Sequence, residues 1–274
     1  MIKKLTLLAF LAVLGTSAFA QVSYGFYGGV IKPAGDLGQT KTINGVDDLQ
    51  NIDNWCLMDA DGKYGFAGIG FNVGFDMALQ IPNVQGLSAI ASFDIMYNNS
   101  NSDITTYFEE YPKSANIFGV AFGVSSKAPQ WLNFPLLFGV SYKYDLGSAF
   151  GIFCEAALGP NFRKISTLEF TEDYFGTVYY MIGVLNIPVT KKEVVYDYDL
   201  AVTFGFKVGA GILFWNDRIS LGFDFYSLGS AKIKGEKTVK LDGTDYSVDL
   251  GGKIKGNNSI SSSELVFRVG YHFQ

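Results

Sequence analysis

The sequence predicts an all-β fold in which eight antiparallel strands close into an up-and-down barrel that crosses a membrane. Three observations support this prediction. Apolar side chains alternate with small or polar ones along eight segments, charged residues in those segments keep to one parity, and the connections alternate between long and short. The 274-residue chain is 48% hydrophobic but only 17% charged, which is typical of a protein with a large apolar surface.

Period-two alternation is clear in the segment 69–79. Phe71 and Phe75 share one face of an extended strand with other apolar residues, whereas Asn72 and Asp76 lie on the opposite face. The same alternation recurs in seven further segments, 22–30, 87–97, 132–143, 151–159, 200–212, 219–225 and 265–273. Segments of about ten residues with alternating rather than continuous apolarity are typical of strands in a transmembrane barrel.

Charged residues within these segments all have the parity opposite to the large apolar residues. This predicted lumen charge network comprises Asp76, Asp94, Lys143, Glu155, Lys207, Asp224 and Arg268. The interior of an eight-stranded barrel is only just wide enough for side chains, so the face rich in Phe and Tyr should lie outside, against lipid. Because unpaired charges in a narrow lumen are costly, we expect the network to pair internally or with trapped water and to close the lumen.

The connections predict which end of the barrel faces outward. Four long ones are expected as extracellular loops, at about 32–63, 98–130, 165–198 and 230–260, and three short ones as periplasmic turns, near 80–86, 145–149 and 215–218. An even number of strands then places both termini of the chain in the periplasm. In an alternative with ten strands, the apolar segments 116–122 and 181–185 also cross the membrane.

The first 20 residues have the pattern of a secretory signal peptide. Two lysines precede an apolar run over 5–14, and Ala18 and Ala20 form an A-x-A cleavage site. The run is shorter than the roughly 20 residues that a membrane-spanning helix needs. We therefore expect residues 1–20 to be removed and residues 21–274 to form a single barrel domain.

Four stretches of the chain resemble a known family. They are Tyr-Gly-Phe-Tyr-Gly-Gly at 24–29, Leu-Asn-Phe-Pro-Leu-Leu at 132–137, Phe-Gly-Phe-Lys-Val-Gly-Ala-Gly at 204–211, and the ending Phe-Arg-Val-Gly-Tyr-His-Phe at 267–273. With the signal peptide, they make the chain similar to small bacterial outer-membrane β-barrel proteins of the porin-family or outer-membrane-barrel-domain type, especially those of Bacteroidetes.

The resemblance implies a location in the outer membrane and a role for the chain's last strand in biogenesis. Gly270, Tyr271 and Phe273 correspond to the terminal signal read by the barrel-insertion machinery, although here Gln274 follows the usual final Phe. The implied partners are outer-membrane lipid, the insertion machinery and periplasmic chaperones.

The sequence favours a structural or surface-interaction role, in which the loops meet an extracellular ligand. A small porin-like channel for ions or small solutes is the alternative, and a lipid-modifying barrel enzyme comes third. No catalytic motif surrounds His272, the only histidine, so we expect no enzyme. The calcium-loop-like stretch 59–62 lacks its distal acidic ligand, so we expect neither metal nor cofactor. A formal net charge of −5 argues against nucleic acid, and we expect a monomer.

Overall fold

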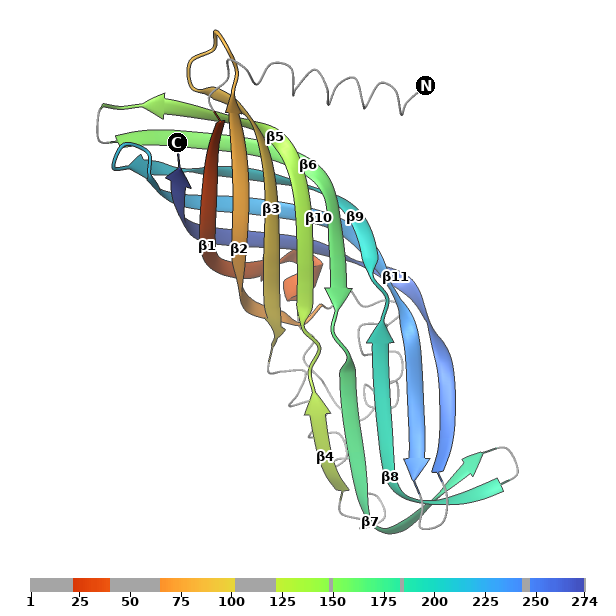
Figure 1. Ribbon diagram of the computed structural model, residues 1–274. Helices are drawn as coiled ribbons and strands as arrows, with labels where there is room; N and C mark the ends of the chain where they lie inside the picture. Colours follow the sequence, from red (N-terminus) through yellow and green to blue (C-terminus); the bar gives the residue numbers. More distant parts are fainter. Residues whose placement is uncertain are drawn as a thin grey trace, which may run out of the picture.

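The computed structural model describes residues 22–39, 65–101, 122–147, 150–182, 185–242 and 247–273. They form one antiparallel sheet of eleven strands, with a short 3-10 helix after the first strand (Figure 1). The elements are β1 (Val22–Ala34), η1 (Gly35–Gly38), β2 (Ala67–Gln80), β3 (Leu87–Ser100), β4 (Phe122–Lys127), β5 (Trp131–Asp145), β6 (Phe150–Ile165), β7 (Leu168–Ile182), β8 (Leu185–Tyr198), β9 (Ala201–Phe214), β10 (Ile219–Asp242) and β11 (Ser247–Phe273). No helix in these ranges has both the length and the apolar character needed to span a membrane.

Eight of the strands close into a ring. Its order is β1-β2-β3-β5-β6-β9-β10-β11, and the ring is completed because β11 pairs with both β10 and β1. These are the eight segments in which the sequence shows period-two alternation. In the ten-strand alternative, residues 181–182 and 185 would cross the membrane, but they lie in β7 and β8, outside the ring. Residues 116–121 lie outside the described ranges.

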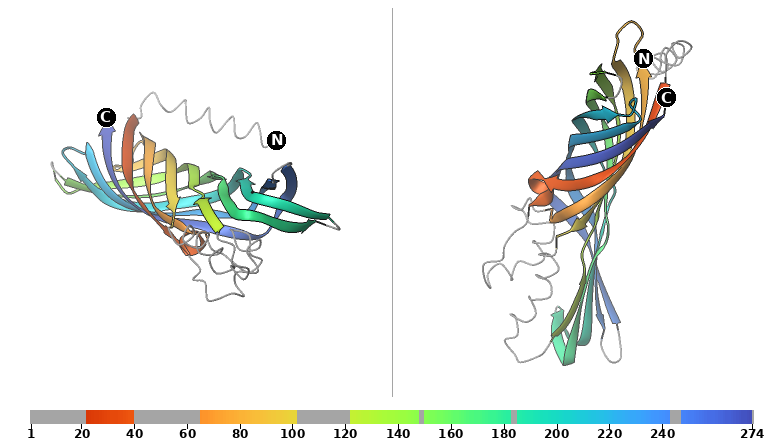
Figure 2. Two further views of the ribbon diagram at one scale, coloured as in Figure 1. Left: turned by 90° about the horizontal axis from the view of Figure 1, so that it is seen from below. Right: turned by 90° about the vertical axis from the view of Figure 1, so that its left-hand side faces the viewer.

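Two ring strands continue far beyond the ring. β10 has 24 residues and β11 has 27, whereas a bilayer is crossed by about 9–11 residues of a tilted strand. Their distal parts leave the ring and form a sheet with β8, β7 and β4, which we call the extension (Figures 1 and 2). The first residues of β1 and the last of β11 lie at the other end of the ring, which we call the terminal end.

The extension changes the interpretation of three connections that the sequence suggested were loops. The segment 98–130 contains β4, the segment 165–198 contains β7 and β8, and the segment 230–260 contains the distal parts of β10 and β11. Charged and apolar residues occur on both faces of β7 and β8, so these strands lack the one-sided apolar alternation of the ring. In the distal part of β10, the exposed face carries charged residues such as Lys232, Glu236 and Lys240 instead of apolar ones. The alternation that identifies the ring strands in the sequence therefore does not identify the strands of the extension.

The outward face of the ring carries exposed apolar side chains on every strand. Phe204 is 65% exposed and Phe223 is 54% exposed, although both lie within strands that are paired on both sides. Other members of this apolar belt are Phe26, Val30, Phe71, Val73, Phe93, Ile95, Phe138, Val140, Ile152, Leu158, Val202, Phe267 and Val269. The predicted outward parity of the aromatic residues is therefore confirmed. A continuous apolar surface of this extent marks contact with lipid or with another protein.

Candidate functional site

Five charged side chains meet inside the ring around Arg268. Its Nη2 lies 2.6 Å from Oε1 of Glu155, and its Nε lies 2.8 Å from Oδ2 of Asp224. Its Nη1 lies 3.8 Å from Oδ2 of Asp76. Lys207 shares Glu155, with Nζ 2.8 Å from the same Oε1. This charge cluster links β2, β6, β9, β10 and β11 across the lumen, which is how buried charges are stabilised in a space with little water.

Three aromatic rings enclose the two cations of the charge cluster. The Arg268 guanidinium carbon lies 4.5 Å from the ring centroid of Tyr27 and 5.5 Å from that of Phe153. Lys207 Nζ lies 5.7 Å from the centroid of Tyr27 and 5.8 Å from that of Tyr226. At these distances a cation is attracted to the face of an aromatic ring. The rings also fill space that water would otherwise occupy.

Sequence reasoning missed these interior aromatics because it expected small residues on the inward face. Small residues do occur there, but they stand beside large ones on neighbouring strands. A Cβ on Gly74 would lie 2.2 Å from the ring of Tyr27, and one on Gly211 would lie 2.5 Å from the ring of Phe153. The glycines therefore leave the space that the aromatics fill. The inward parity of Tyr27 and Phe153 was the available signal.

The other two charges of the predicted network have different surroundings. Asp94 is fully buried and accepts hydrogen bonds from Asn72 Nδ2, at 3.2 Å, and from the Tyr226 hydroxyl, at 3.3 Å. Lys143 lies apart, at the terminal end, where its Nζ contacts the carboxylate of Asp217 and lies 3.0 Å from Oδ1 of Asp145. Lys143 thus joins β5 to the turn between β9 and β10.

A small cavity opens at the terminal end of the ring. Its volume is about 120 Å³, and its lining includes Ser23, Ser88, Ser141, Lys143, Asp76, Glu155, Arg268 and His272. Pockets that hold small organic ligands have volumes of about 300–1,000 Å³, so this cavity is small for that purpose. Because Glu155 and Arg268 form part of its lining, the cavity reaches the charge cluster.

His272 lies beside this cavity and contacts two side chains. Its Nε2 lies 2.9 Å from Oγ of Ser220, and its Nδ1 lies 4.0 Å from Oδ1 of Asp76. A histidine between a serine and an aspartate is also the arrangement of a hydrolase triad. However, Ser220 is only 1% exposed, and 4.0 Å is too long for a hydrogen bond between histidine and carboxylate. The arrangement therefore holds His272 in the wall of the cavity without presenting a nucleophile.

A second buried polar layer lies between the charge cluster and the extension. Arg163 donates from Nε to Oδ1 of Asn133, at 3.2 Å, and from Nη1 and Nη2 to the carbonyls of Ile260 and Gly229. Asn133 Nδ2 in turn donates to Oε1 of Glu264 at 3.0 Å. Arg163 is 1% exposed and Glu264 is fully buried. Sequence reasoning missed both, although each has the inward parity of its strand, because Arg163 lies beyond the end of the predicted segment 151–159 and Glu264 lies just before the start of the segment 265–273.

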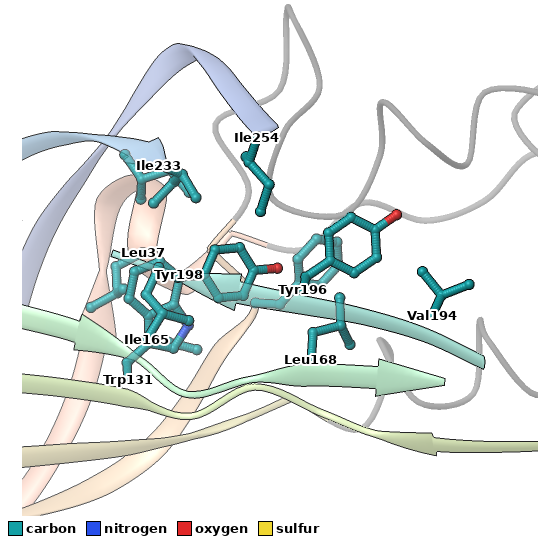
Figure 3. Packing of buried hydrophobic residues seen from close by; sticks show 12 residues of the cluster. Leu37, Trp131, Ile165, Leu168, Val194, Tyr196, Tyr198, Ile233 and Ile254 are labelled. Carbon is teal, nitrogen blue, oxygen red and sulfur yellow. The ribbon is translucent and has the colours of Figure 1, made fainter. Parts of the chain in front are cut away.

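A cluster of buried apolar residues lies where the ring meets the extension (Figure 3). Trp131 is fully buried there, and its Nε1 donates to the carbonyl of Gly65 at 2.9 Å. The junction cluster comprises Leu37, Phe66, Ala67, Trp131, Ile165, Leu168, Val194, Tyr196, Tyr198, Ile233, Ile254 and Ile260. From the terminal end to the extension, the lumen therefore contains a small cavity, a charge cluster, a polar layer and an apolar cluster.

The other residues predicted from sequence lie at the terminal end or outside the described ranges. Tyr271 and Phe273 point outward, with their ring centroids 4.8 Å apart, while Gly270 is buried beside Ser220. Ala18, Ala20 and the stretch 59–62 are not among the described residues. Within the described ranges, no group of three or more His, Cys, Asp or Glu side chains is arranged to hold a metal ion.

Comparison with known proteins gives distant likenesses only. No protein-family model and no curated protein matches the chain. Among solved structures, Neisserial surface protein A has a TM-score of 0.36 at 11% identity, covering 93% of this chain and 99% of that one. A major outer membrane protein from Thermus thermophilus has a TM-score of 0.39 at 9% identity, covering 92% and 100%. The Ail protein of Yersinia pestis has a TM-score of 0.31 at 10% identity, covering 93% and 97%. At these values the likeness does not indicate what this chain binds or does.

Proposed function

We propose that this chain is an outer-membrane β-barrel protein with a closed lumen, which anchors the extension at the cell surface. The observation that carries the proposal is the combination of an apolar belt outside the ring with three buried layers inside it. The belt suits the ring to lipid, and the layers leave little room for solute. The barrel then acts as an anchor, and the parts outside the membrane meet the environment.

The length and composition of the extension support a surface role. Its strands continue beyond the apolar belt, and their outward face carries charged residues such as Lys240 and Asp197, both exposed. Irregular or charged surface is tolerated outside the hydrocarbon layer but not within it. The extension is thus suited to water, and its distance from the terminal end suits it to the extracellular side.

A porin-like channel is the second candidate, and the cavity at the terminal end is the observation that favours it. That cavity reaches Glu155 and Arg268, whose side chains are 7% and 1% exposed. A solute would have to displace ion pairs there and then pass the polar layer and the junction cluster. We therefore prefer a closed anchor, without catalytic activity, to a channel or an enzyme.

Site-directed labelling on intact cells tests the anchor and its orientation. With the native Cys56 and Cys154 replaced by serine, a single cysteine is placed at Lys240 in the extension or at the exposed Val84 in the turn between β2 and β3. A maleimide on a polyethylene glycol chain too large for porins should label Lys240→Cys on intact cells. It should label Val84→Cys only after the outer membrane is permeabilised. Labelling of Val84→Cys on intact cells, or of neither cysteine, contradicts the proposal.

A further inference from the structure

Charges on the outward face of the extension are arranged in complementary pairs. Lys240 of β10 lies in register with Glu193 of β8 on one side and with Asp249 of β11 on the other. Lys127 lies opposite Glu169, with Nζ 3.5 Å from Oε1. Opposite charges in directly facing positions stabilise an antiparallel pair, whereas like charges there destabilise it.

One pair of acidic residues departs from this pattern, but each member has a lysine nearby. Glu236 lies in register with Asp197, which would be unfavourable for two carboxylates alone. Lys253 faces Glu236 from the other side, and Lys164 Nζ lies 3.4 Å from Oδ1 of Asp197. The local charge is therefore balanced within the sheet.

The charges in the part of the extension nearest the ring are not balanced in this way. Lys234 of β10 lies directly opposite Lys255 of β11, and Lys232 lies opposite the uncharged Ser259. Lys232 and Lys234 are exposed, and none of the ion pairs among the described residues includes either of them. We call Lys232 and Lys234 the lysine row. It places two exposed lysines on one face of β10, two residues apart, without ion pairs such as those that Lys127 and Lys164 form.

The lysine row lies at the edge of the apolar belt. The backbone N–H of Asp199 donates to the carbonyl of Lys234 at 2.9 Å, and the next residue, Leu200, is 58% exposed. Val202, on the same face of β9, is 62% exposed. The ladder between β10 and β11 is irregular here, with register shifts on both sides of Lys232 and Gly229 at a φ of +77°. Such bulges redirect side chains at the rim of a barrel.

We propose that the lysine row binds phosphate groups of an anionic lipid in the outer leaflet. The inference rests on the proposed function, because only an inserted ring brings lipid headgroups to this level. Lysine is a common ligand for phosphate, and each lysine near an anionic membrane surface strengthens attraction by about fivefold. Phosphate would also supply a counter-charge to Lys232 and Lys234, neither of which takes part in an ion pair among the described residues.

Binding of bisphosphorylated lipid A to the full chain tests the proposal. The protein is refolded into zwitterionic phosphatidylcholine nanodiscs, and retention of added lipid A is compared with retention of its dephosphorylated form by native mass spectrometry. We expect the phosphorylated form to be preferred, and Lys232→Gln/Lys234→Gln to bind it about 25-fold more weakly, from two contributions of about fivefold. The matched control Lys191→Gln/Lys240→Gln removes two lysines from the same face at its end far from the ring, and should bind as the parent does.

Urea unfolding gives a second, independent test, because the effect of Lys234→Gln on stability should change sign when anionic lipid is added. Without anionic lipid, Lys234→Gln should raise resistance to urea, because positions 234 and 255 are directly opposite in register and two like charges at such positions destabilise an antiparallel pair. With phosphorylated lipid A present, the same substitution should lower it relative to the parent. If the parent retains both lipid forms equally, or if Lys232→Gln/Lys234→Gln binds as the parent does, the inference is overturned. If the protein retains heparin but not the phosphorylated lipid, the inference is also overturned. A soluble sulfated glycan would then be the favoured ligand. Failure of the ring to insert at all would instead overturn the proposed function.

Discussion

Replacement of Arg268 by methionine is expected to lower the free energy of unfolding by about 3–5 kcal/mol. Arg268 is 1% exposed and forms ion pairs with Glu155 and Asp224, so its removal leaves buried carboxylates with less compensation. The two carboxylates differ in the ion pairs that remain after Arg268 is replaced. Glu155 keeps the ion pair with Lys207, whereas Asp224 has no second ion pair among the described residues. Urea unfolding of the protein in liposomes measures the loss.

Two companion variants separate the buried network from a general effect of charge. Adding Asp224→Asn to Arg268→Met should recover part of the lost stability, because the carboxylate left without a partner is then neutral. Lys164→Met removes a partly exposed cation that lies 3.4 Å from Asp197 and should change stability by less than about 1 kcal/mol. A small effect of Arg268→Met, no larger than that of Lys164→Met, would contradict a stabilising role for the charge cluster.

Replacement of Phe223 by arginine is expected to cost about 2–4 kcal/mol in a lipid bilayer. Phe223 is 54% exposed, points away from the lumen, and lies opposite Ala210 and Phe267 within the apolar belt. A charge at this position must leave water for hydrocarbon if the ring crosses the membrane. The cost is measured as the difference in unfolding free energy between variant and parent in liposomes.

The control for this substitution lies on the same strand beyond the ring. Thr238 is on the outward face of β10 in the extension, where Glu236 and Lys240 are its neighbours along the strand. Thr238→Arg should change stability by no more than about 0.5 kcal/mol, because a charge there stays in water. Equal costs for Phe223→Arg and Thr238→Arg would show that the belt is not in contact with hydrocarbon.

The ring was largely predictable because lipid imposes a simple rule on its sequence. Every lipid-facing position must be apolar, so the alternation marked all eight ring strands and separated outward residues such as Phe223 from inward ones such as Asp224. The same rule identified the charges that meet at Arg268. Parity, however, shows only on which face of the strand a residue lies, and not which residues it contacts. The position of Lys143 at the terminal end, apart from the charge cluster, could be found only from the register of the strands.

The extension and the second polar layer were not predictable by the same rule. Strands β7 and β8 lie outside the lipid-facing ring, so Lys192 and Val194 share a face and the apolar alternation disappears. Arg163 and Glu264 sit just beyond the segments that the alternation marked, although their parity was correct. Tyr27 fits inside the ring only because Gly74 faces it from β2, and that match requires knowledge of the strand pairing.

Planar-bilayer recording tests the closed lumen most directly. The purified full chain is inserted into a bilayer, and insertion is shown independently by the resistance of the ring strands to added protease. The account predicts no stable conductance steps, because the charge cluster, the polar layer around Arg163 and the junction cluster around Trp131 occupy successive levels of the lumen. Stable, reproducible steps of one size from inserted protein would contradict it and would favour the channel.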